Sequence, residues 1–499
     1  MVLSLGSKTF GFLRDIALSY FYGASSISDV FLISQLIPMS ILEFVGLGLL
    51  TGYIPLHDEI EKKHGKDRSQ KFTNDIICII IVISTVLVFF GFIFTKQLVY
   101  VFASGFEGET LKMAVLFTRI TLFSIYFVTM GYLFKGYLQI KEKYLVSVIT
   151  GFPLNLIIII GIVISTMTHP VVLAIGSLIA IIVQFLILIR SSYKQGYRFK
   201  WSLDFFNEHI RDLLKLAIPM VAGISVNQIN VIVDRTLASR ISEGGISALN
   251  YANRLNFFVQ GMFVVSLTTV MYPIISKLAS NKDLYGLKLK IKEAINIMNI
   301  LLLPVSMGAL IFSTPIIKLL FGRGAFTLEA ISITASALLF YSIGMVAFGL
   351  REVLSRTFYS LKDTKTPMIN ASIGLTVNVV LNILLSRYLG IGGLALATSI
   401  SAIFTTFLLF ISLHKKIGPF GMKQISISFL KILFASSIMG LFAKLSFNYL
   451  IASLSQNLSL LIAIGVGALS YFVIIYFMKI EDVDVIVGAI KKKLGRGAA

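Results

Sequence analysis

Ionised side chains inside long apolar segments are the residues of this chain that could do chemistry. Arg254 lies about a third of the way along such a segment. Three asparagines flank it at helical spacing: Asn250, Asn253 and Asn256. An ionised side chain at the middle of a bilayer costs about 2.5–3.5 kcal/mol on the insertion scale, so a membrane helix that keeps one usually faces a polar cavity. Arg254 is therefore predicted to face a cavity.

Other ionised residues lie nearer the ends of apolar segments, where two interpretations stay open. They are Lys8, Arg14, Asp15, Asp29, Glu43, Arg119, Asp234 and Arg235. A long side chain near a helix end can reach the lipid headgroups. For Lys8, Arg119 and Arg235, this interpretation and a polar cavity explain the charge equally. Asp29 follows several serines at the start of its segment, so it could also be an ordinary helix N-cap.

The sequence offers no pattern for metal, nucleotide or disulfide chemistry. Cys78 is the only cysteine and lies in an apolar segment, and the five histidines form no HExxH pair. The phosphate-binding pattern GxxxxGK[ST] is also absent, so any energy for a reaction cycle must come from an ion or voltage gradient or from downstream consumption. We expect no cofactor, and any coupling ion is left unidentified. Lys8, Arg14 and Asp15 interrupt the first segment, which argues against a cleavable signal peptide.

Composition identifies lipid as the solvent of most of the chain. The mean hydropathy is +0.88, 56% of the 499 residues are hydrophobic and only 14% are charged. A water-soluble core cannot be built from this composition, because too few polar side chains would cover too many apolar ones. The net charge of +20 comes from short basic clusters at the ends of apolar segments. This arrangement is typical of topology determinants that face anionic lipid and unlike a nucleic-acid-binding groove.

The chain is predicted to be an all-α polytopic membrane protein with about fourteen membrane helices. An apolar segment of about 20 residues is needed to cross the hydrocarbon. The segments lie near residues 2–22, 26–56, 73–101, 111–138, 145–167, 170–190, 212–239, 246–276, 288–317, 327–360, 366–387, 391–413, 424–450 and 457–479. The gap after the second segment holds five basic residues and the gap after the first holds none. Even-numbered gaps are therefore predicted to be cytoplasmic, and with them both termini.

The longest predicted cytoplasmic link divides the first six segments from the rest. It holds the only tryptophan of the chain, in WSLDFFNEHIRDLLK, which suits a short amphipathic helix along the interface. We expect an N-terminal half (1–190), an amphipathic linker (191–211), a C-terminal half (212–413), two further helices (424–480) and a basic cytoplasmic tail (481–499). A faint repeat supports the halves: the first and seventh segments carry the charged pairs Arg14-Asp15 and Asp234-Arg235. Two related halves are typical of alternating-access transporters.

Several motifs, in order along nearly the whole chain, resemble the MurJ (MviN) family of lipid II flippases, within the multidrug/oligosaccharidyl-lipid/polysaccharide exporter superfamily. GFLRDIALSYFYGASSISDVFLISQLIP is similar to the family's first signature. PMVAGISVNQINVIVDRTLAS and GGISALNYANRLNFFVQGMFVVSLTTVMYP resemble its seventh and eighth helices. GRGAFTLEA, LSRTFYSLKDTKTP and GIGGLALATSIS follow the same pattern. Each motif is weak alone, and their order and spacing make the resemblance specific.

The resemblance implies a transporter of a bacterial cytoplasmic (inner) membrane, with two six-helix halves around a central cationic cavity. Its substrate would be undecaprenyl diphosphate carrying a peptidoglycan headgroup, moved from the inner to the outer leaflet by alternating access. Arg14 and Arg254 would bind the diphosphate, with Lys8 a weaker third contact. Gating residues or charge partners would be Asp29, Asp15, Asp234, Asn253 and Gln228. Membrane lipids, and proteins of cell-wall synthesis, would be its other partners.

Two departures from the family bear on the substrate. The family's second helix usually carries a basic pair and an acidic-glycine step, whereas PMSILEFVGLGLLTGYIP has no basic residue between Pro38 and Pro55 and has Leu47 about where the acid would be. Lys8 stands where the family usually has Arg. These departures leave open a flippase for another lipid-linked oligosaccharide, or a scaffold that has lost transport.

Two further classes of protein remain as alternatives. A cation exporter is disfavoured because the central candidates are mainly basic. A membrane-embedded glycosyltransferase needs clustered acids on a sizeable loop, and the acids of the predicted outside loops are scattered. We therefore expect a transporter and not an enzyme.

Overall fold

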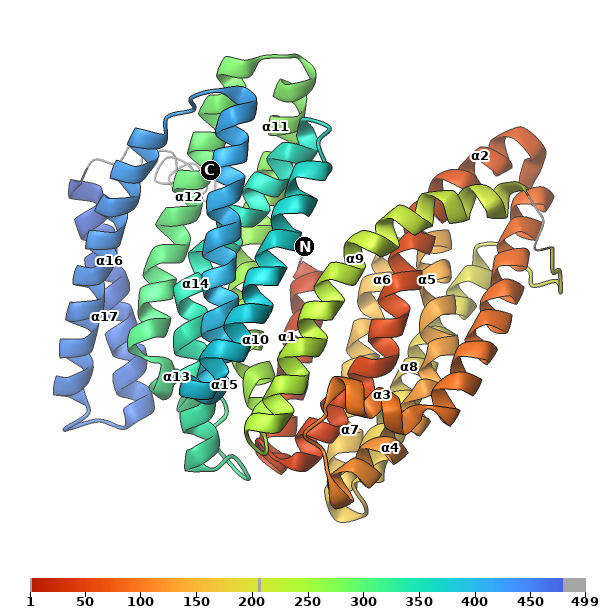
Figure 1. The fold of residues 1–499 in the computed structure, drawn as a ribbon, viewed down its shortest axis with the longest axis horizontal. Coiled ribbons are helices and arrows are strands. Elements are labelled where there is room, and N and C mark those ends of the chain that lie inside the picture. The colour runs from red at the N-terminus through yellow and green to blue at the C-terminus, as the bar shows by residue number, and fades with distance from the viewer. Residues whose placement is uncertain (1, 205–207, 479–499) are drawn as a thin grey trace, which may run out of the picture. The chain divides into compact units, whose positions relative to one another are not determined.

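The computed structural model describes residues 2–204 and 208–478, and these form helices joined by short connections (Figure 1). Contacts divide the chain into two compact units: unit 1 holds residues 1–247 and 323–330, and unit 2 holds residues 248–322 and 331–499. Ten helices among the described residues are long and apolar enough to cross a membrane. The chain is thus a multi-pass membrane protein of the all-α class. The count of fourteen spans stays a prediction.

Unit 1 is built around the long helix α2. Its helices are α1 (Val2–Tyr22), α2 (Ser26–Ile93), α3 (Thr95–Phe102), α4 (Gly108–Leu122), α5 (Ser124–Ile140), α6 (Tyr144–Ile149), α7 (Gly151–Met167), α8 (Val171–Lys194) and α9 (Glu208–Ile241). Helices α4, α5 and α9 pack along α2, whereas α7 packs between α1 and α8. Helix α9, which the sequence assigns to the second half, thus lies with unit 1 by its contacts. The predicted division into halves stays a prediction.

Unit 2 is a second bundle. Its elements are α10 (Gly245–Val259, whose first turn falls in unit 1), the π-helix η1 (Gln260–Val264), α11 (Val265–Ser280), α12 (Leu284–Ile311), α13 (Ser313–Leu320), α14 (Leu328–Ser360), α15 (Lys365–Ile417), α16 (Met422–Leu450) and α17 (Gln456–Phe477). Its apolar core joins α11, α12, α14, α15, α16 and α17. Helix α16 packs between α12 and α17.

Two glycines divide the longest helices into limbs that correspond to separate predicted segments. Gly65, with φ 83°, interrupts α2 between the second and third segments. Gly390, with φ 55°, interrupts α15 between the eleventh and twelfth. These φ values lie in the left-handed region that side chains with a Cβ rarely adopt. The polar gap predicted at 57–72 is therefore helical except at Gly65. The charged residues of this gap extend the two limbs of α2 beyond the apolar segments.

The amphipathic helix predicted at WSLDFFNEHIRDLLK is wrong over residues 201–204, which are not helical, whereas residues 208–215 of the same motif form the start of α9. Helix α8 continues to Lys194, residues 195–204 are not helical, and α9 begins at Glu208. Gly196, with φ 89°, turns the chain away from α8. The side chains of Tyr197 and Ser202 then bond to α2. These bonds hold the segment extended against α2, which local periodicity could not indicate. The tail predicted at 481–499 lies outside the described residues.

Candidate functional site

Helix α1 carries an ion pair between neighbours in sequence. The Nε and Nη2 of Arg14 donate to Oδ1 of Asp15 at 3.2 and 2.9 Å. The Asp15 side chain is 2% exposed and that of Arg14 is 17% exposed. The pair keeps a buried carboxylate compensated, as a low-dielectric interior requires. The guanidinium has three further N–H donors besides these two. Lys8, seven residues before Asp15 and hence on its face of the helix, is exposed.

Asp29 caps a helix other than its own. Its Oδ1 accepts a 2.7 Å hydrogen bond from the backbone N–H of Ser247. Helix α10 begins at Gly245, so this N–H is one of the four at its start that have no partner within the helix. The N-cap of α2 is Ser25, whose Oγ accepts from the N–H of Ser28 at 3.4 Å. The simple N-cap interpretation of Asp29 is therefore wrong: the carboxylate joins α2 to the positive end of α10.

Two glycines allow the connections around Asp29 to meet backbone to backbone. Gly23 has φ 63°, and a Cβ there would lie 2.4 Å from the carbonyl oxygen of Ala325. The N–H of Ala325 donates to the carbonyl of Tyr20 at 2.8 Å. Gly244 has φ 72°, and a Cβ there would lie 2.3 Å from the carbonyl oxygen of Ala24. Neither position tolerates a side chain, because backbone atoms occupy the space.

Side chains complete the same closure. The N–H of Ser26 donates to Glu243 at 3.2 Å, and Nε of Arg240 donates to Oγ of Ser104 at 2.6 Å. The N–H of Gly105 donates to Oγ of Ser239 at 3.0 Å. We call the joined segments the outer seam: residues 20–29, 104–105, 239–247 and 323–326. All four contain or adjoin gaps that the charge pattern places outside, and all lie in unit 1.

Unit 2 holds the cation that the sequence singled out. Arg254 lies on α10 with its side chain exposed, and Asn253 beside it is half-buried. Asn256 is buried, and its Oδ1 accepts from Nε2 of Gln260 at 3.2 Å. Gln260 opens the π-helix η1, and such π-turns inside α-helices are frequent at functional sites. The apolar pattern of this segment did not indicate η1.

The remaining predicted residues lie on α9, in unit 1. Gln228 is buried and Asp234 is half-buried. Arg235 donates through Nη1 to the carbonyl of Ile246 at 3.1 Å, so it contributes to the outer seam. The structure therefore places Arg14, Asp15, Lys8, Asp29, Gln228 and Asp234 in unit 1, and Asn253 and Arg254 in unit 2. The side chain of Glu43 is not among those that the structure describes.

Several cations inside predicted apolar segments were missed by the sequence reasoning, and two of them lie beside aromatic rings. Lys135 on α5 lies with its Nζ 5.6 Å from the ring centroid of Tyr132. Arg351 on α14 is exposed, and its Cζ lies 5.4 Å from the ring centroid of Phe348. In both cases an aromatic ring one helical turn earlier supports the charge. The criterion that identified Arg254, an ionised residue within an apolar segment, would have found both.

Metal ligands are not gathered anywhere in residues 2–204 and 208–478. Within those ranges no group of three His, Cys, Asp or Glu side chains is close enough to hold a metal ion. Cys78 is a buried free thiol on α2. The interactions that the site residues described above make are hydrogen bonds and ion pairs.

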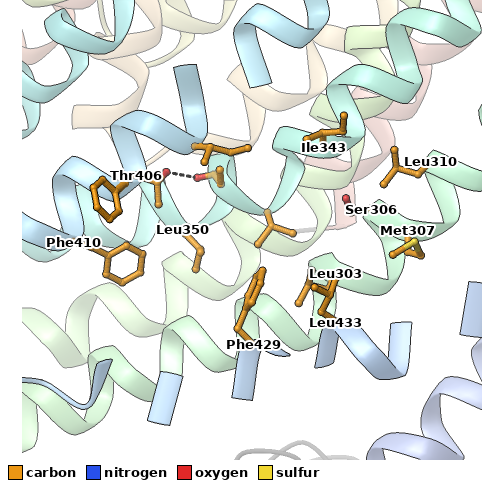
Figure 2. Close-up of a pocket in the computed structure, with 14 residues that line it drawn as sticks. Leu303, Ser306, Met307, Leu310, Ile343, Leu350, Thr406, Phe410, Phe429 and Leu433 are labelled. Atoms are coloured by element: carbon orange, nitrogen blue, oxygen red, sulfur yellow. Dashed lines mark hydrogen bonds between the residues drawn. The ribbon is translucent and has the colours of Figure 1, made fainter. Parts of the chain in front are cut away.

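Unit 2 also contains an apolar pocket of about 410 Å³ between α12, α14, α15 and α16 (Figure 2). Its two hydroxyls are already bonded: Thr406 Oγ1 donates to the carbonyl of Ala347 at 2.9 Å, and Ser306 donates to the carbonyl of Ser342. Phe410, Phe429 and other apolar side chains line the rest. The pocket thus presents hydrocarbon, and it suits an apolar chain better than a charged headgroup.

Comparison with known proteins gives a consistent result. Residues 18–481 match the family model described as lipid II flippase MurJ. The lipid II flippase MurJ of Thermosipho africanus is 31% identical over 468 residues, covering 94% of this chain and 93% of that protein. The probable lipid II flippase MurJ of Vibrio cholerae is 28% identical, covering 97% and 95%.

Solved structures agree with these relatives. A structure of the lipid II flippase MurJ in an inward closed conformation superposes with a TM-score of 0.84 at 28% identity, covering 97% of this chain and 99% of that one. An inward-facing multidrug resistance MATE family transporter of the MOP superfamily has a TM-score of 0.70 at 13% identity, covering 82% and 94%. The second match shows a shared fold only.

Proposed function

The chain belongs to the lipid II flippase MurJ family, and from that premise we propose that it moves lipid II from the inner to the outer leaflet of the cytoplasmic membrane by alternating access. The match to the MurJ structure over 97% of this chain is the observation that carries the proposal. The substrate is an undecaprenyl diphosphate bearing a sugar-peptide headgroup. The physical task is to move two phosphates and a polar sugar across hydrocarbon, by transport and without a catalytic step.

The proposed diphosphate contacts are Arg14 and Arg254, with Lys8 as a weaker third. Arg14 keeps donors of its guanidinium fork beyond those given to Asp15. Arg254 has an exposed side chain among polar neighbours on α10. A planar guanidinium fork matches phosphate oxygens better than the point charge of Lys8. Asp234, Asn253 and Gln228 are the proposed charge and gating partners, and the coupling ion is not specified.

The outer seam bears on the release of the headgroup. Asp29 and the glycines at 23 and 244 join connections that the charge pattern places outside. We infer that these contacts must separate before a headgroup is released there.

The proposed orientation puts both termini and the even-numbered gaps in the cytoplasm. Cysteine labelling tests it directly. A Ser25→Cys variant should react with a membrane-impermeant thiol reagent in intact cells, and a Lys66→Cys variant should react only after permeabilisation. The reverse pattern would contradict the orientation and, with it, the assignment of the outer seam.

A different lipid-linked oligosaccharide is the second candidate substrate, and the missing second-helix charges favour it. The decisive experiment is to deplete a cell of its own lipid II flippase and supply this chain. We expect peptidoglycan synthesis to continue with the unmodified chain and to stop with Arg254→Ala at equal membrane level. If the unmodified chain reaches the membrane and synthesis still stops, lipid II is not its substrate.

A further inference from the structure

The linker after α8 forms a strap fixed to the second limb of α2. We define the strap as residues 196–203, seen in Figure 1 as the extended segment that follows α8 and runs beside α2. Nε2 of Gln70 donates to the carbonyl of Gly196 at 2.8 Å. The hydroxyl of Tyr197 donates to Oδ1 of Asn74 at 2.6 Å, and Oγ of Ser202 donates to Oδ1 of Asp75 at 2.5 Å. The strap therefore has a defined inner face.

The inner face is also packed. Tyr197 is 0% exposed. Its ring centroid lies 5.3 Å from that of Phe134 and 5.7 Å from that of Tyr137, both on α5. Between Tyr197 and Ser202, the side chains of residues 198–201 are all exposed. The exposure of the outer face is thus built into the fold and does not depend on a loose loop.

The outer face combines large apolar side chains with basic ones. Phe199 is 40% exposed, Trp201 67% and Leu203 43%. The rings of Phe199 and Trp201 contact each other edge to face, with centroids 6.4 Å apart. Lys200 lies between them in sequence and is exposed. Adjacent aromatic and basic side chains of this kind are typical of the membrane–water interface, where rings sit at headgroup level.

The contacts with α2 set the depth of the strap. Gly196 bonds to Gln70 and Ser202 bonds to Asp75, so the strap descends along α2 by about five residues, or about 7.5 Å at 1.5 Å per residue. Directly after Asp75, α2 becomes a continuous apolar run, IICIIIVI. Trp201 is the neighbour of Ser202, so it lies at the level where α2 enters the hydrocarbon.

Basic groups lie on the strap and at the end of α8, on the polar side of Trp201. Lys194 ends α8, and both it and Lys200 are exposed. Arg198 donates through Nη1 to the carbonyls of Tyr193 and Tyr197 at 3.0 and 2.9 Å, which fixes its charge at the end of α8. Lys and Arg side chains at a membrane surface attract anionic lipid, each by about fivefold in affinity.

We propose that the strap binds anionic phospholipid headgroups, with Phe199 and Trp201 inserted at headgroup level and Lys194 and Lys200 contacting the lipid phosphates. The partner is a bilayer phospholipid, and the site is separate from the cations assigned to the transported diphosphate. The location in the cytoplasmic leaflet rests on the proposed orientation. The binding itself does not.

The chain provides its own probe, because Trp201 is its only tryptophan. Purified protein is titrated with phosphatidylglycerol carrying brominated acyl chains, and quenching of the tryptophan emission is recorded. Brominated phosphatidylcholine is titrated in parallel. We expect quenching by both lipids, with half-quenching at a lower concentration of phosphatidylglycerol. Lys194→Gln with Lys200→Gln should raise the phosphatidylglycerol midpoint about 25-fold, from about fivefold per charge, and leave the phosphatidylcholine midpoint unchanged.

A matched control removes the same charge nearby. Lys62 and Lys63 lie on α2, exposed and paired with Asp58 and Glu59, and their double replacement by Gln should leave both midpoints in place. Equal shifts in the two double variants would mean that a long-range field, and not the strap, selects the lipid. Equal midpoints for the two lipids would overturn headgroup recognition, and no quenching by either would place Trp201 in water. No transport occurs in this measurement, so its outcome is independent of the flippase proposal.

Discussion

Replacing Asp29 should open the outer seam, by an amount that depends on what the new side chain retains. Asp29 is 1% exposed, and its carboxylate accepts the N–H of Ser247 at the start of α10. Asn keeps an oxygen acceptor but loses the charge that the positive helix end favours. Ala removes the acceptor and leaves the N–H of Ser247, a fully buried residue, without its partner.

The expected sizes follow from hydrogen-bond energetics. A hydrogen bond to an ionised group contributes about 1.5–3 kcal/mol to stability and a neutral one about 0.5–1.5 kcal/mol. Asp29→Asn should therefore cost the closed seam about 1 kcal/mol, which is about a fivefold rise in the ratio of open to closed forms. Asp29→Ala should cost about 2–3 kcal/mol, because the stranded N–H is desolvated, and this is about a 30- to 150-fold rise.

The readout is the reactivity of a buried thiol within the outer seam. Ser28 is 0% exposed, and its Oγ donates to the carbonyl of Gly23 at 2.8 Å. A Ser28→Cys variant in a Cys78→Ala background carries a single buried thiol of nearly the same size as the hydroxyl. When opening and closing are fast relative to labelling, its rate with a membrane-impermeant reagent is proportional to the open population.

A matched control separates the seam from a general effect of lost charge. Asp58 is an exposed carboxylate on the same helix, paired with Lys62. Asp58→Asn should leave the labelling rate unchanged. The reasoning is refuted if Asp29→Ala labels Ser28→Cys no faster than the parent, or if Asp29→Asn and Asp29→Ala give the same rate.

Three further variants test other parts of the structure. Lys8→Ala should impair complementation nearly as much as Arg14→Ala, since the cation usual in the family's second helix is missing here. Adding Ile41→Arg to the Lys8→Ala variant should partly restore complementation. Full activity of Lys8→Ala would show that two cations suffice. Lys416, 2.7 Å away, and the Thr366 N–H lower the pKa of Asp363 from 3.8 to about 2. The stabilisation is complete above about pH 4 and is lost as the pH falls through 2. Asp363→Asn should therefore lower Tm clearly at pH 5 and much less near pH 2.

The apolar pattern predicted the helices well because lipid leaves a membrane protein few alternatives. Hydrocarbon offers no partner for backbone N–H and C=O groups, so every long apolar segment has to be helical or part of a closed barrel. Short interruptions such as Phe94, Phe123 and Phe312 escaped prediction, since they change the direction of a helix without adding polar residues. The prediction for the linker was wrong because long-range contacts determine the conformation of residues 196–203. Its strap is held by Asn74 and Asp75 on α2, which are distant in sequence and cannot be recognised from local periodicity.

The candidate residues were easier to find than their partners. An ionised residue in an apolar segment is visible in the sequence, and this identified Arg14, Asp29 and Arg254. What Asp29 contacts was not predictable, because the backbone N–H of Ser247 has no signature in the sequence.

The best position for adding a cation to the second predicted helix is also clearer in the structure than in the sequence. Ser40 is 3% exposed whereas Ile41 is half-buried, so a guanidinium is accommodated better at 41.

Two buried acids are engaged by other groups of the protein, and this bears on the sign of the substrate. Asp15 accepts two hydrogen bonds from Arg14, and Asp29 accepts the N–H of Ser247 at the start of α10; both carboxylates are buried. Lys8 and Arg254 are instead exposed. A cation would have to displace the partners of these two carboxylates, whereas the proposed diphosphate would not. Asp15 and Asp29 are thus committed to contacts within the protein.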